Sequence, residues 1–280
     1  MIEVNGLVKI YKLTKRQMRQ RKEKDNVKTA VDGITFKAIP GEIFGLLGPN
    51  GAGKTTTLRC ISTLLSPTEG SIRVCGLETT SRGVEVRKRI AFLTNELKLD
   101  GHFTPRYTIR YFGSLYNMAS EEIEARAASL FKTFGIEGFQ DTKIDDLSTG
   151  MKQKLSIAVS LIHDPEVVIF DEPTNGLDII TARSVTDYLM SLKAEGKTII
   201  VSTHIMSVAE KLCDRFAVIL GGKIVAQGTL EDVLRAAGNQ LQPQPQTQDE
   251  APDTILDLED AFFRFYLRQE QEDHADGVIS

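Results

Sequence analysis

Tryptophan is absent from the 280-residue sequence, and cysteine is scarce, with only Cys60, Cys75 and Cys213. An odd number of cysteines without metal-like spacing argues against a disulfide-stapled secreted fold and favours a reducing compartment. Positive charge is not in excess either, since 34 Lys and Arg stand against 38 Asp and Glu, for a net charge of −4. We therefore expect no global positive field that recruits nucleic acid or acidic lipid.

Long apolar runs are also missing. Apolar runs such as residues 167–170 and 198–201 are far shorter than the roughly 20 residues that cross a bilayer as a helix. The N-terminal stretch MIEVNGLVKIYK has no basic region followed by an apolar one, so it does not predict an export signal. We expect a protein that stays inside the cell and reaches a membrane only through a partner.

What is present predicts an ordinary globular protein, with 41% hydrophobic and 26% charged residues. Residues 2–10 and 29–38 alternate apolar and polar side chains, which predicts strands of an antiparallel patch. The stretch 12–28 between them carries eight Lys and Arg against Glu23 and Asp25. We interpret this stretch as a solvated surface loop, and the alternative is a contact with phosphate or lipid headgroups.

The middle of the chain predicts α/β structure. Residues 42–47 form an apolar strand that leads through a glycine-rich turn into TTTLRCISTLL, whose Leu58, Ile61, Leu64 and Leu65 recur at helical spacing. Residues 105–164 lack strand-like runs and predict helices. Apolar runs at 166–170 and 197–202 flank a helix at about 181–194, so this βαβ unit predicts a parallel sheet.

Towards the C-terminus, residues 216–220 and 223–226 predict a hairpin around Gly221-Gly222. We expect one α/β domain over residues 1–238, with a helical subdomain at about 97–164. A Gln- and Pro-rich linker follows at 239–253, and residues 254–280 predict an amphipathic helix and tail. Phe262, Phe263, Phe265 and Leu267 of that helix are expected to dock onto the domain, although a partner-binding helix is the alternative.

The strongest motif is a phosphate-binding loop. The sequence GPNGAGKT fits the pattern G-x-x-x-x-G-K-[ST] in full, between a strand and a helix. Glycines let backbone N–H groups approach phosphate oxygens, and Lys54 reaches the β- and γ-phosphates while Thr55 offers a hydroxyl to Mg²⁺. The predicted nucleotide-binding residues of this segment are Gly48, Pro49, Asn50, Gly51, Ala52, Gly53, Lys54, Thr55 and Thr56.

Two carboxylates follow the apolar run at residues 167–170. Asp171 and Glu172 come where the strand is expected to end, which is the edge at which α/β sheets bind ligands. Asp171 suits the shell of a Mg²⁺ ion, and Glu172 suits a general base for water.

Further motifs make the chain resemble the ATP-binding subunits of ABC (ATP-binding cassette) transporters, with an α/β P-loop NTPase core. LSTGMKQ at residues 147–153 stands in place of the family signature LSGGQ, followed by LSIAVSLI and HDPEVVIFDEPT. Thr149 and Met151 depart from the signature, whereas Ser148 and Gly150 are retained. The resemblance implies that Ser148 and Gly150 contact the γ-phosphate of ATP held by a second subunit.

The same resemblance assigns four more residues. Asp178 closes a D-loop at residues 175–178, and His204 in STHIM matches the switch histidine that senses the γ-phosphate. Tyr11 matches the aromatic residue that stacks on adenine. Asn95 stands at the position of the Q-loop glutamine, one methylene shorter, and would act as a catalytic and metal-contacting residue.

The resemblance covers residues 2–230 and is closest to the sodium-exporter branch of ABC-2 type ATPase subunits. It implies MgATP hydrolysis by a head-to-tail pair of subunits that drives export of Na⁺ or another solute through a polytopic permease, on the cytoplasmic face of the membrane. No specific nucleic acid is expected. The alternatives are a soluble ABC-type ATPase acting on nucleic acid or the ribosome, and a non-hydrolysing ATP-binding regulator.

Overall fold

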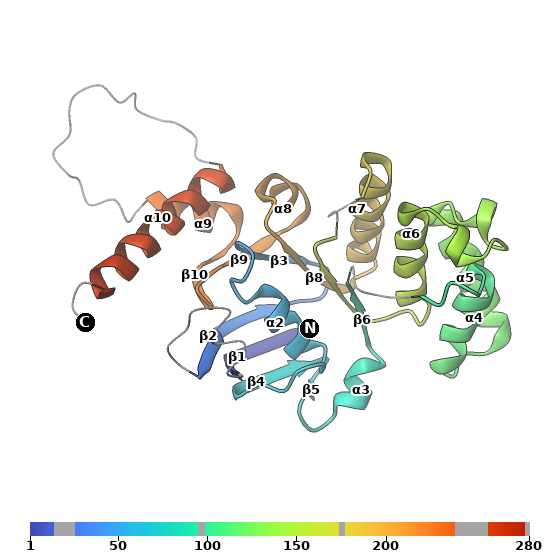
Figure 1. Cartoon of the computed structure of the whole chain (residues 1–280), viewed down its shortest axis with the longest axis horizontal. Helices are drawn as coiled ribbons and strands as arrows, with labels where there is room; N and C mark the ends of the chain where they lie inside the picture. The colour runs from blue at the N-terminus through green and yellow to red at the C-terminus, as the bar shows by residue number, and fades with distance from the viewer. Residues whose placement is uncertain (14–25, 95–98, 174–176, 239–256, 278–280) are drawn as a thin grey trace.

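A computed structural model describes residues 1–13, 26–94, 99–173, 177–238 and 257–277. The centre of the basic stretch, Asn95, the first residues of the D-loop and the linker at 239–253 lie outside these ranges. Two sheets occupy the middle of the molecule, and helices extend it at both ends (Figure 1). Among the described residues, no helix combines the length and apolarity that a membrane span requires.

A four-stranded antiparallel sheet forms the predicted N-terminal patch. Its strand order is β2-β1-β4-β5, and β1 pairs with both β2 and β4, so that Ile2 lies opposite Ala38 on one side and Val74 on the other. The two long strands extend further into the basic stretch than predicted, because Lys12 pairs with Val27 at their shared end. The strands are β1 (Ile2–Lys12), β2 (Val27–Ala38), β4 (Glu69–Val74) and β5 (Leu77–Glu78).

A six-stranded sheet has the order β10-β9-β3-β8-β7-β6 and is parallel except for the hairpin strand β10, which confirms the predicted parallel sheet. Its central strands are apolar on both faces because both faces are covered. The strands are β3 (Ile43–Leu47), β6 (Ile90–Leu93), β7 (Val167–Asp171), β8 (Thr198–Thr203), β9 (Arg215–Leu220) and β10 (Lys223–Gly228).

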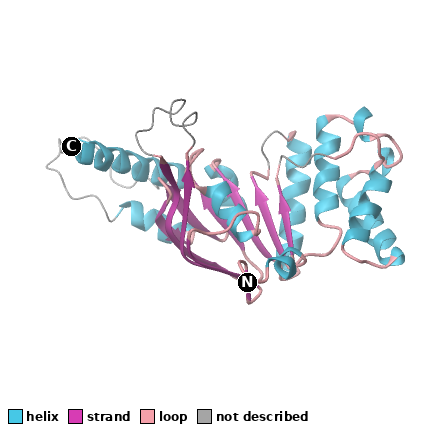
Figure 2. Ribbon diagram, turned by 60° about the horizontal axis from the view of Figure 1, so that its bottom comes forward, coloured by secondary structure: helices cyan, strands magenta, loops and turns pink. Residues whose placement is uncertain are grey.

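Alternation along these strands divides the apolar side chains between two cores. Phe44 and Leu46 face α2 (Lys54–Ile61) and the antiparallel sheet, whereas Ile43 and Leu47 face the opposite core. Helices on that second side include α7 (Ile179–Ala194), α8 (Met206–Leu212) and α9 (Leu230–Gly238). The parallel sheet is thus sandwiched between two layers (Figure 2), and the carboxyl ends of its strands are left as the accessible edge.

The predicted helical stretch is confirmed. It contains α4 (Pro105–Leu115), α5 (Ser120–Phe134), the short 3₁₀ turns Glu137–Phe139 and Ile144–Asp146, and α6 (Thr149–Ser160). These helices gather at one end of the long axis (Figure 1). The remaining short helix, α3 (Gly83–Arg87), precedes β6.

Two helix expectations need correction. The helix after the phosphate loop ends at Ile61, because Thr63 adopts a left-handed φ of 64°, and Leu64 is 58% exposed instead of continuing the buried face. The C-terminal helix α10 (Leu258–Gly277) docks through Phe265 and partly through Phe262, but Phe263 and Leu267 point to solvent. Only one face of a single helix can pack against the domain, and Phe262, Phe263, Phe265 and Leu267 do not all lie on one face.

Candidate nucleotide-binding site

The loop between β3 and α2 depends on glycine at two points. A Cβ on Gly48 would stand 2.2 Å from the carbonyl oxygen of Ile219, and a Cβ on Gly53 would stand 2.5 Å from that of Ala30. Gly53 also has a φ of 110°, which disfavours other residues, and it immediately precedes the helix. The loop is therefore held against β9 and β2, with its backbone exposed for phosphate oxygens at a helix N-terminus.

Lys54 is buried beneath this loop. Its Nζ donates to the carbonyl oxygens of Gly48 at 2.7 Å and Pro49 at 3.1 Å, and lies 3.8 Å from Oε1 of Glu172. Burial lowers the pKa of the Lys54 ammonium group from its ordinary value, although the carboxylates of Glu172 and Asp171 act in the opposite direction. The loop thus holds the Lys54 ammonium group, the one cation of the GPNGAGKT motif, where the phosphates of a nucleotide are expected to bind.

The two predicted carboxylate residues are consecutive at the carboxyl end of β7. Asp171 is the last residue of β7, and its Oδ1 accepts a hydrogen bond from Oγ of Ser202. Glu172 has a left-handed φ of 58°, and its carboxylate oxygens both lie 3.0 Å from Nδ1 of His204. Glu172 is accordingly contacted by a lysine on one side and a histidine on the other.

These groups meet at a cavity of about 280 Å³. It brings together most of the predicted phosphate-loop residues and both carboxylates, while Gly48, Pro49 and Ala52 belong to the loop without lining the cavity. Its described lining residues are Ala30, Asn50, Gly51, Gly53, Lys54, Thr55, Thr56, Arg59, Thr94, Asp171 and Glu172. Ala30, Arg59 and Thr94 were not predicted, because nothing in their local sequence distinguishes them from structural residues.

The cavity offers ligands that suit Mg²⁺. The Thr55 hydroxyl and the Asp171 carboxylate line the same space, and a hard cation prefers such oxygen donors. Among the described residues, no group of three or more His, Cys, Asp or Glu side chains forms a protein-only metal site. This donor set fits a cation that takes one or two protein ligands and completes its shell with phosphate and water oxygens.

The signature residues lie elsewhere. Ser148 caps the N-terminus of α6, where its Oγ accepts from the N–H of Met151 at 3.3 Å, and Gly150 follows in the first turn. Asp178 caps α7 by accepting from the N–H and hydroxyl of Thr181 at 2.9 and 2.7 Å. Neither Ser148, Gly150 nor Asp178 is among the described residues that line the Lys54 cavity.

Tyr11 is likewise outside the described lining of the cavity. It lies near the end of β1, where Nζ of Lys9 stands 5.6 Å from the centroid of its ring. Its assignment as an adenine-stacking residue stays a prediction. The same holds for Asn95, which lies outside the described residues.

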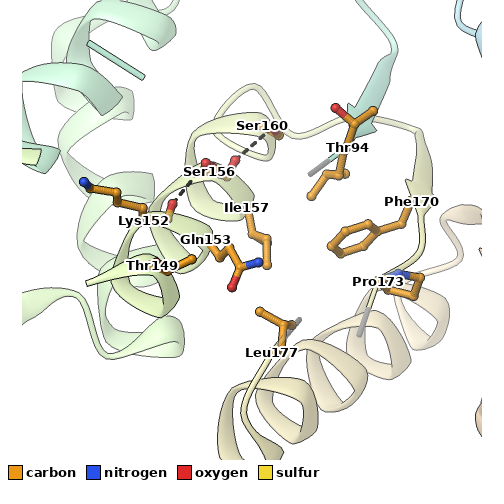
Figure 3. A pocket seen from close by; sticks show the side chains of 11 residues that line it. Thr94, Thr149, Lys152, Gln153, Ser156, Ile157, Ser160, Phe170, Pro173 and Leu177 are labelled. Carbon is orange, nitrogen blue, oxygen red and sulfur yellow. Dashed lines mark hydrogen bonds between the residues drawn. The ribbon is translucent and has the colours of Figure 1, made fainter. Parts of the chain in front are cut away.

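A second cavity, of about 180 Å³, separates α6 from the carboxyl ends of β6 and β7 (Figure 3). Gln153 reaches into it from α6, facing Leu177, while Thr94 and Phe170 line the opposite side. Oε1 of Gln153 is buried without a hydrogen-bond partner in the described part of the chain. Thr94, directly after β6, lines both cavities.

Comparison with known proteins agrees with this geometry. Residues 31–175 match the family described as "ABC transporter". The chain is 41% identical over 216 residues to the ABC transporter ATP-binding protein NatA of Bacillus subtilis (strain 168), covering 77% of this chain and 88% of NatA. It is 43% identical over 201 residues to the Nod factor export ATP-binding protein I of Paraburkholderia xenovorans (strain LB400), covering 72% of this chain and 66% of that protein.

A solved structure is similar over most of the fold. It is the dimeric structure of a post-hydrolysis state of an ATP-binding cassette bound to ADP and Pi, with a TM-score of 0.72 and 27% identity, covering 82% of this chain and 99% of that one. The similarity in both sequence and fold identifies the kind of domain that surrounds the Lys54 cavity.

Proposed function

Since the chain belongs to the ABC transporter family as an ATP-binding, ATP-hydrolysing subunit, we propose that it drives export through a separate polytopic permease, at the cytoplasmic face of the membrane. Na⁺ or another solute would be the cargo. The observation that carries the proposal is the convergence of Lys54, Asp171 and Glu172 on one cavity. Export is supported by the name of one relative, the Nod factor export ATP-binding protein I.

The cavity's residues divide the work of hydrolysis. The loop N–H groups and Lys54 bind and neutralise phosphate oxygens, and Thr55 and Asp171 would hold Mg²⁺, which adds positive charge beside the γ-phosphate. Glu172 orients the attacking water and accepts its proton. His204 is outside the described lining of the cavity, but its Nδ1 lies 3.0 Å from the Glu172 carboxylate. We propose that it keeps that carboxylate in place and senses the γ-phosphate.

A second copy of the chain would complete each site. Ser148 and Gly150 lie at the N-terminus of α6, outside the described lining of the cavity that contains Lys54. Exposed N–H groups at a helix N-terminus suit an anion, so we propose a head-to-tail pair in which each α6 closes the ATP of the partner. The dimeric state of the similar cassette supports this arrangement.

The permease would dock in a broad groove of about 590 Å³ beside β6. Apolar and cationic side chains line it, including Leu64, Phe92, Arg87 and Tyr116, and Leu64 is 58% exposed. Thr94 lines both this groove and the Lys54 cavity, so a segment seated in the groove contacts the strand that leads to the nucleotide.

Affinity purification of the chain from detergent-solubilised native membranes tests the proposal. A polytopic membrane protein should co-purify in stoichiometric amount. Leu64→Asp should lose it while ATP binding stays within about twofold, because an unpaired carboxylate would be buried in the apolar contact. Leu267→Asp, on the exposed face of α10, is the matched control and should retain the partner. Recovery of only soluble or ribosomal components would overturn the transporter assignment and leave the ATPase chemistry intact.

A further inference from the structure

Ser202 is a fully buried polar residue near the carboxyl end of β8, a central strand of the parallel sheet. It lies in β8 between Asp171 of β7 and Leu46 of β3, and the preceding residues of the strand, Ile200 and Val201, are apolar. A hydroxyl is unfavourable at such a position unless it is hydrogen-bonded, and a β-branched apolar residue would fit the strand better. Its presence therefore calls for an explanation in terms of its partners.

Both predicted carboxylate residues are those partners. The Ser202 hydroxyl donates to Oδ1 of Asp171 and accepts from the N–H of Glu172 at 3.2 Å. The same N–H also donates to the Ser202 carbonyl oxygen at 3.1 Å. One side chain thus joins the carboxylate of one residue to the backbone of the next.

The backbone at Glu172 needs this support. Its φ of 58° lies in the left-handed region, which a side chain with a Cβ seldom adopts unless its surroundings hold it there. This turn directs the Glu172 carboxylate towards Lys54 at 3.8 Å and His204 at 3.0 Å. The parallel register pairs Ser202 with Asp171, the residue before Glu172, and residues paired across neighbouring strands point to the same face. Ser202 therefore lies beside Asp171 and next to the turn at Glu172.

We propose that Ser202 is a positioning residue for ATP hydrolysis. Its hydroxyl fixes the Asp171 carboxylate at the edge of the sheet and holds the strained turn of Glu172, so that both carboxylates are set before nucleotide arrives. Ser202 is fully buried and is not among the described residues that line the Lys54 cavity, so it acts through the two carboxylate residues. The inference concerns the ATP-hydrolysing site of the proposed function and does not depend on the permease or its cargo.

The test compares Ser202→Thr with Ser202→Val in the purified chain. The two side chains have nearly the same shape, but only threonine keeps the hydroxyl. We expect Ser202→Val to lower kcat about tenfold with KM for ATP within about twofold, since a hydrogen bond to a charged group is lost while the phosphate loop is untouched. Ser202→Thr should retain at least half of the kcat that the unmodified chain shows.

A second readout needs no turnover. In the Glu172→Gln background with ATP bound, Mn²⁺ affinity measured by electron paramagnetic resonance should fall about threefold or more in Ser202→Val and stay unchanged in Ser202→Thr, because Asp171 is no longer held. Thr198→Val is the matched control. Thr198 is a buried hydroxyl on the same face of β8, bonded to the N-terminal amine at 2.9 Å and far from the carboxylates.

Equal kcat and equal Mn²⁺ affinity in the valine and threonine variants would overturn the role of the hydroxyl. A loss of kcat in Thr198→Val as large as that in Ser202→Val would also overturn the proposal, because it would show that the loss comes from disturbed packing of β8. Both outcomes are independent of membrane co-purification, so failure of this inference and failure of the transporter assignment are distinguishable.

Discussion

His204 and Glu172 are joined in the structure through the histidine Nδ1, which lies 3.0 Å from each oxygen of the glutamate carboxylate. Lys54 approaches the same carboxylate to 3.8 Å from the phosphate loop. Glu172 is 16% exposed in its side chain and His204 is 41% exposed, so the pair stands at the boundary between the sheet and the solvent-facing cavity. A water placed there would meet a carboxylate whose orientation is already determined on both sides.

Replacing Glu172 with glutamine should stop hydrolysis and leave ATP binding intact. Glutamine keeps the size of the side chain but cannot accept the proton of the attacking water, so kcat should fall by about a hundredfold or more. Because the bound ATP is not hydrolysed, the head-to-tail pair should persist, and size-exclusion chromatography in saturating MgATP should give a dimer. A monomer under these conditions would contradict the two-site arrangement.

Lys54→Ala should lose nucleotide binding itself. Lys54 is the charged group held under the phosphate loop by Gly48 and Pro49, and its removal takes a hydrogen-bonded charge from the phosphates. We expect the Kd for ATP to rise at least about tenfold, measured by calorimetry. Lys37→Ala is the control, since Lys37 pairs with Glu3 on the antiparallel sheet. This variant should bind ATP with an unchanged Kd. An unchanged Kd in Lys54→Ala would contradict the assigned role.

The sequence predicted which segments come together at the Lys54 cavity better than it predicted the ends of the helices. The phosphate loop and the pair Asp171 and Glu172 were predictable because close phosphate approach and strand-end carboxylates require particular residues at particular spacings. The parallel sheet followed from apolar runs long enough to be buried on both faces. In contrast, the early end of α2 at Ile61 depends on the left-handed turn at Thr63, which no periodicity shows.

The contribution of Ser202 was not predictable from the sequence. A serine before Thr203 and His204 indicates only the end of a strand. The proposed positioning role depends on the register that places Ser202 beside Asp171. Thr94, which directly follows β6, and Arg59 of α2 line the Lys54 cavity for a similar reason, since tertiary packing brings them there. Side chains that act through neighbours across a sheet leave no local pattern to find.

His163 should make the protein less stable in acid. Burial lowers its pKa to about 4 in the folded chain, where its ring stacks on Tyr116 with centroids 3.8 Å apart and bonds the Ile90 carbonyl at 3.1 Å. The folded state binds fewer protons than the unfolded state, whose histidine pKa is near 6.5, so stability is lost as pH falls from about 6.5 towards 4. The loss attributable to this residue is at most about 3 kcal/mol.

His163→Phe tests that assignment by urea unfolding between pH 7.5 and 4.5. Phenylalanine keeps a ring against Tyr116 but cannot titrate, and it gives up the bond to Ile90. We expect the variant to be about 1 kcal/mol less stable at pH 7.5 and to lose less stability than the unmodified chain on acidification. Parallel stability curves for the two proteins would show that another group controls the acid limb.

Phe265 and Phe263 of α10 should differ sharply when each is replaced by alanine. Phe265 is 4% exposed and packs with Leu258 and Ala261 in the core beneath α9, whereas Phe263 is 59% exposed. The N-terminus of α10 is also tied to the domain, because the N–H of Leu258 donates to Glu210 at 2.6 Å. Removing a buried phenyl ring typically costs about 3–5 kcal/mol, and removing an exposed one has an effect within about 0.5 kcal/mol.

The measurement is urea unfolding followed by both circular dichroism and limited proteolysis near residue 257. If α10 is an integral part of the core, Phe265→Ala shifts a single transition to lower urea and Phe263→Ala leaves it in place. If instead Phe265→Ala leaves the main transition unchanged and only speeds cleavage before α10, the helix unfolds on its own and its docking adds little to the domain. That result would contradict the packing argument, because a ring buried in the common core cannot be removed without loosening the elements around it.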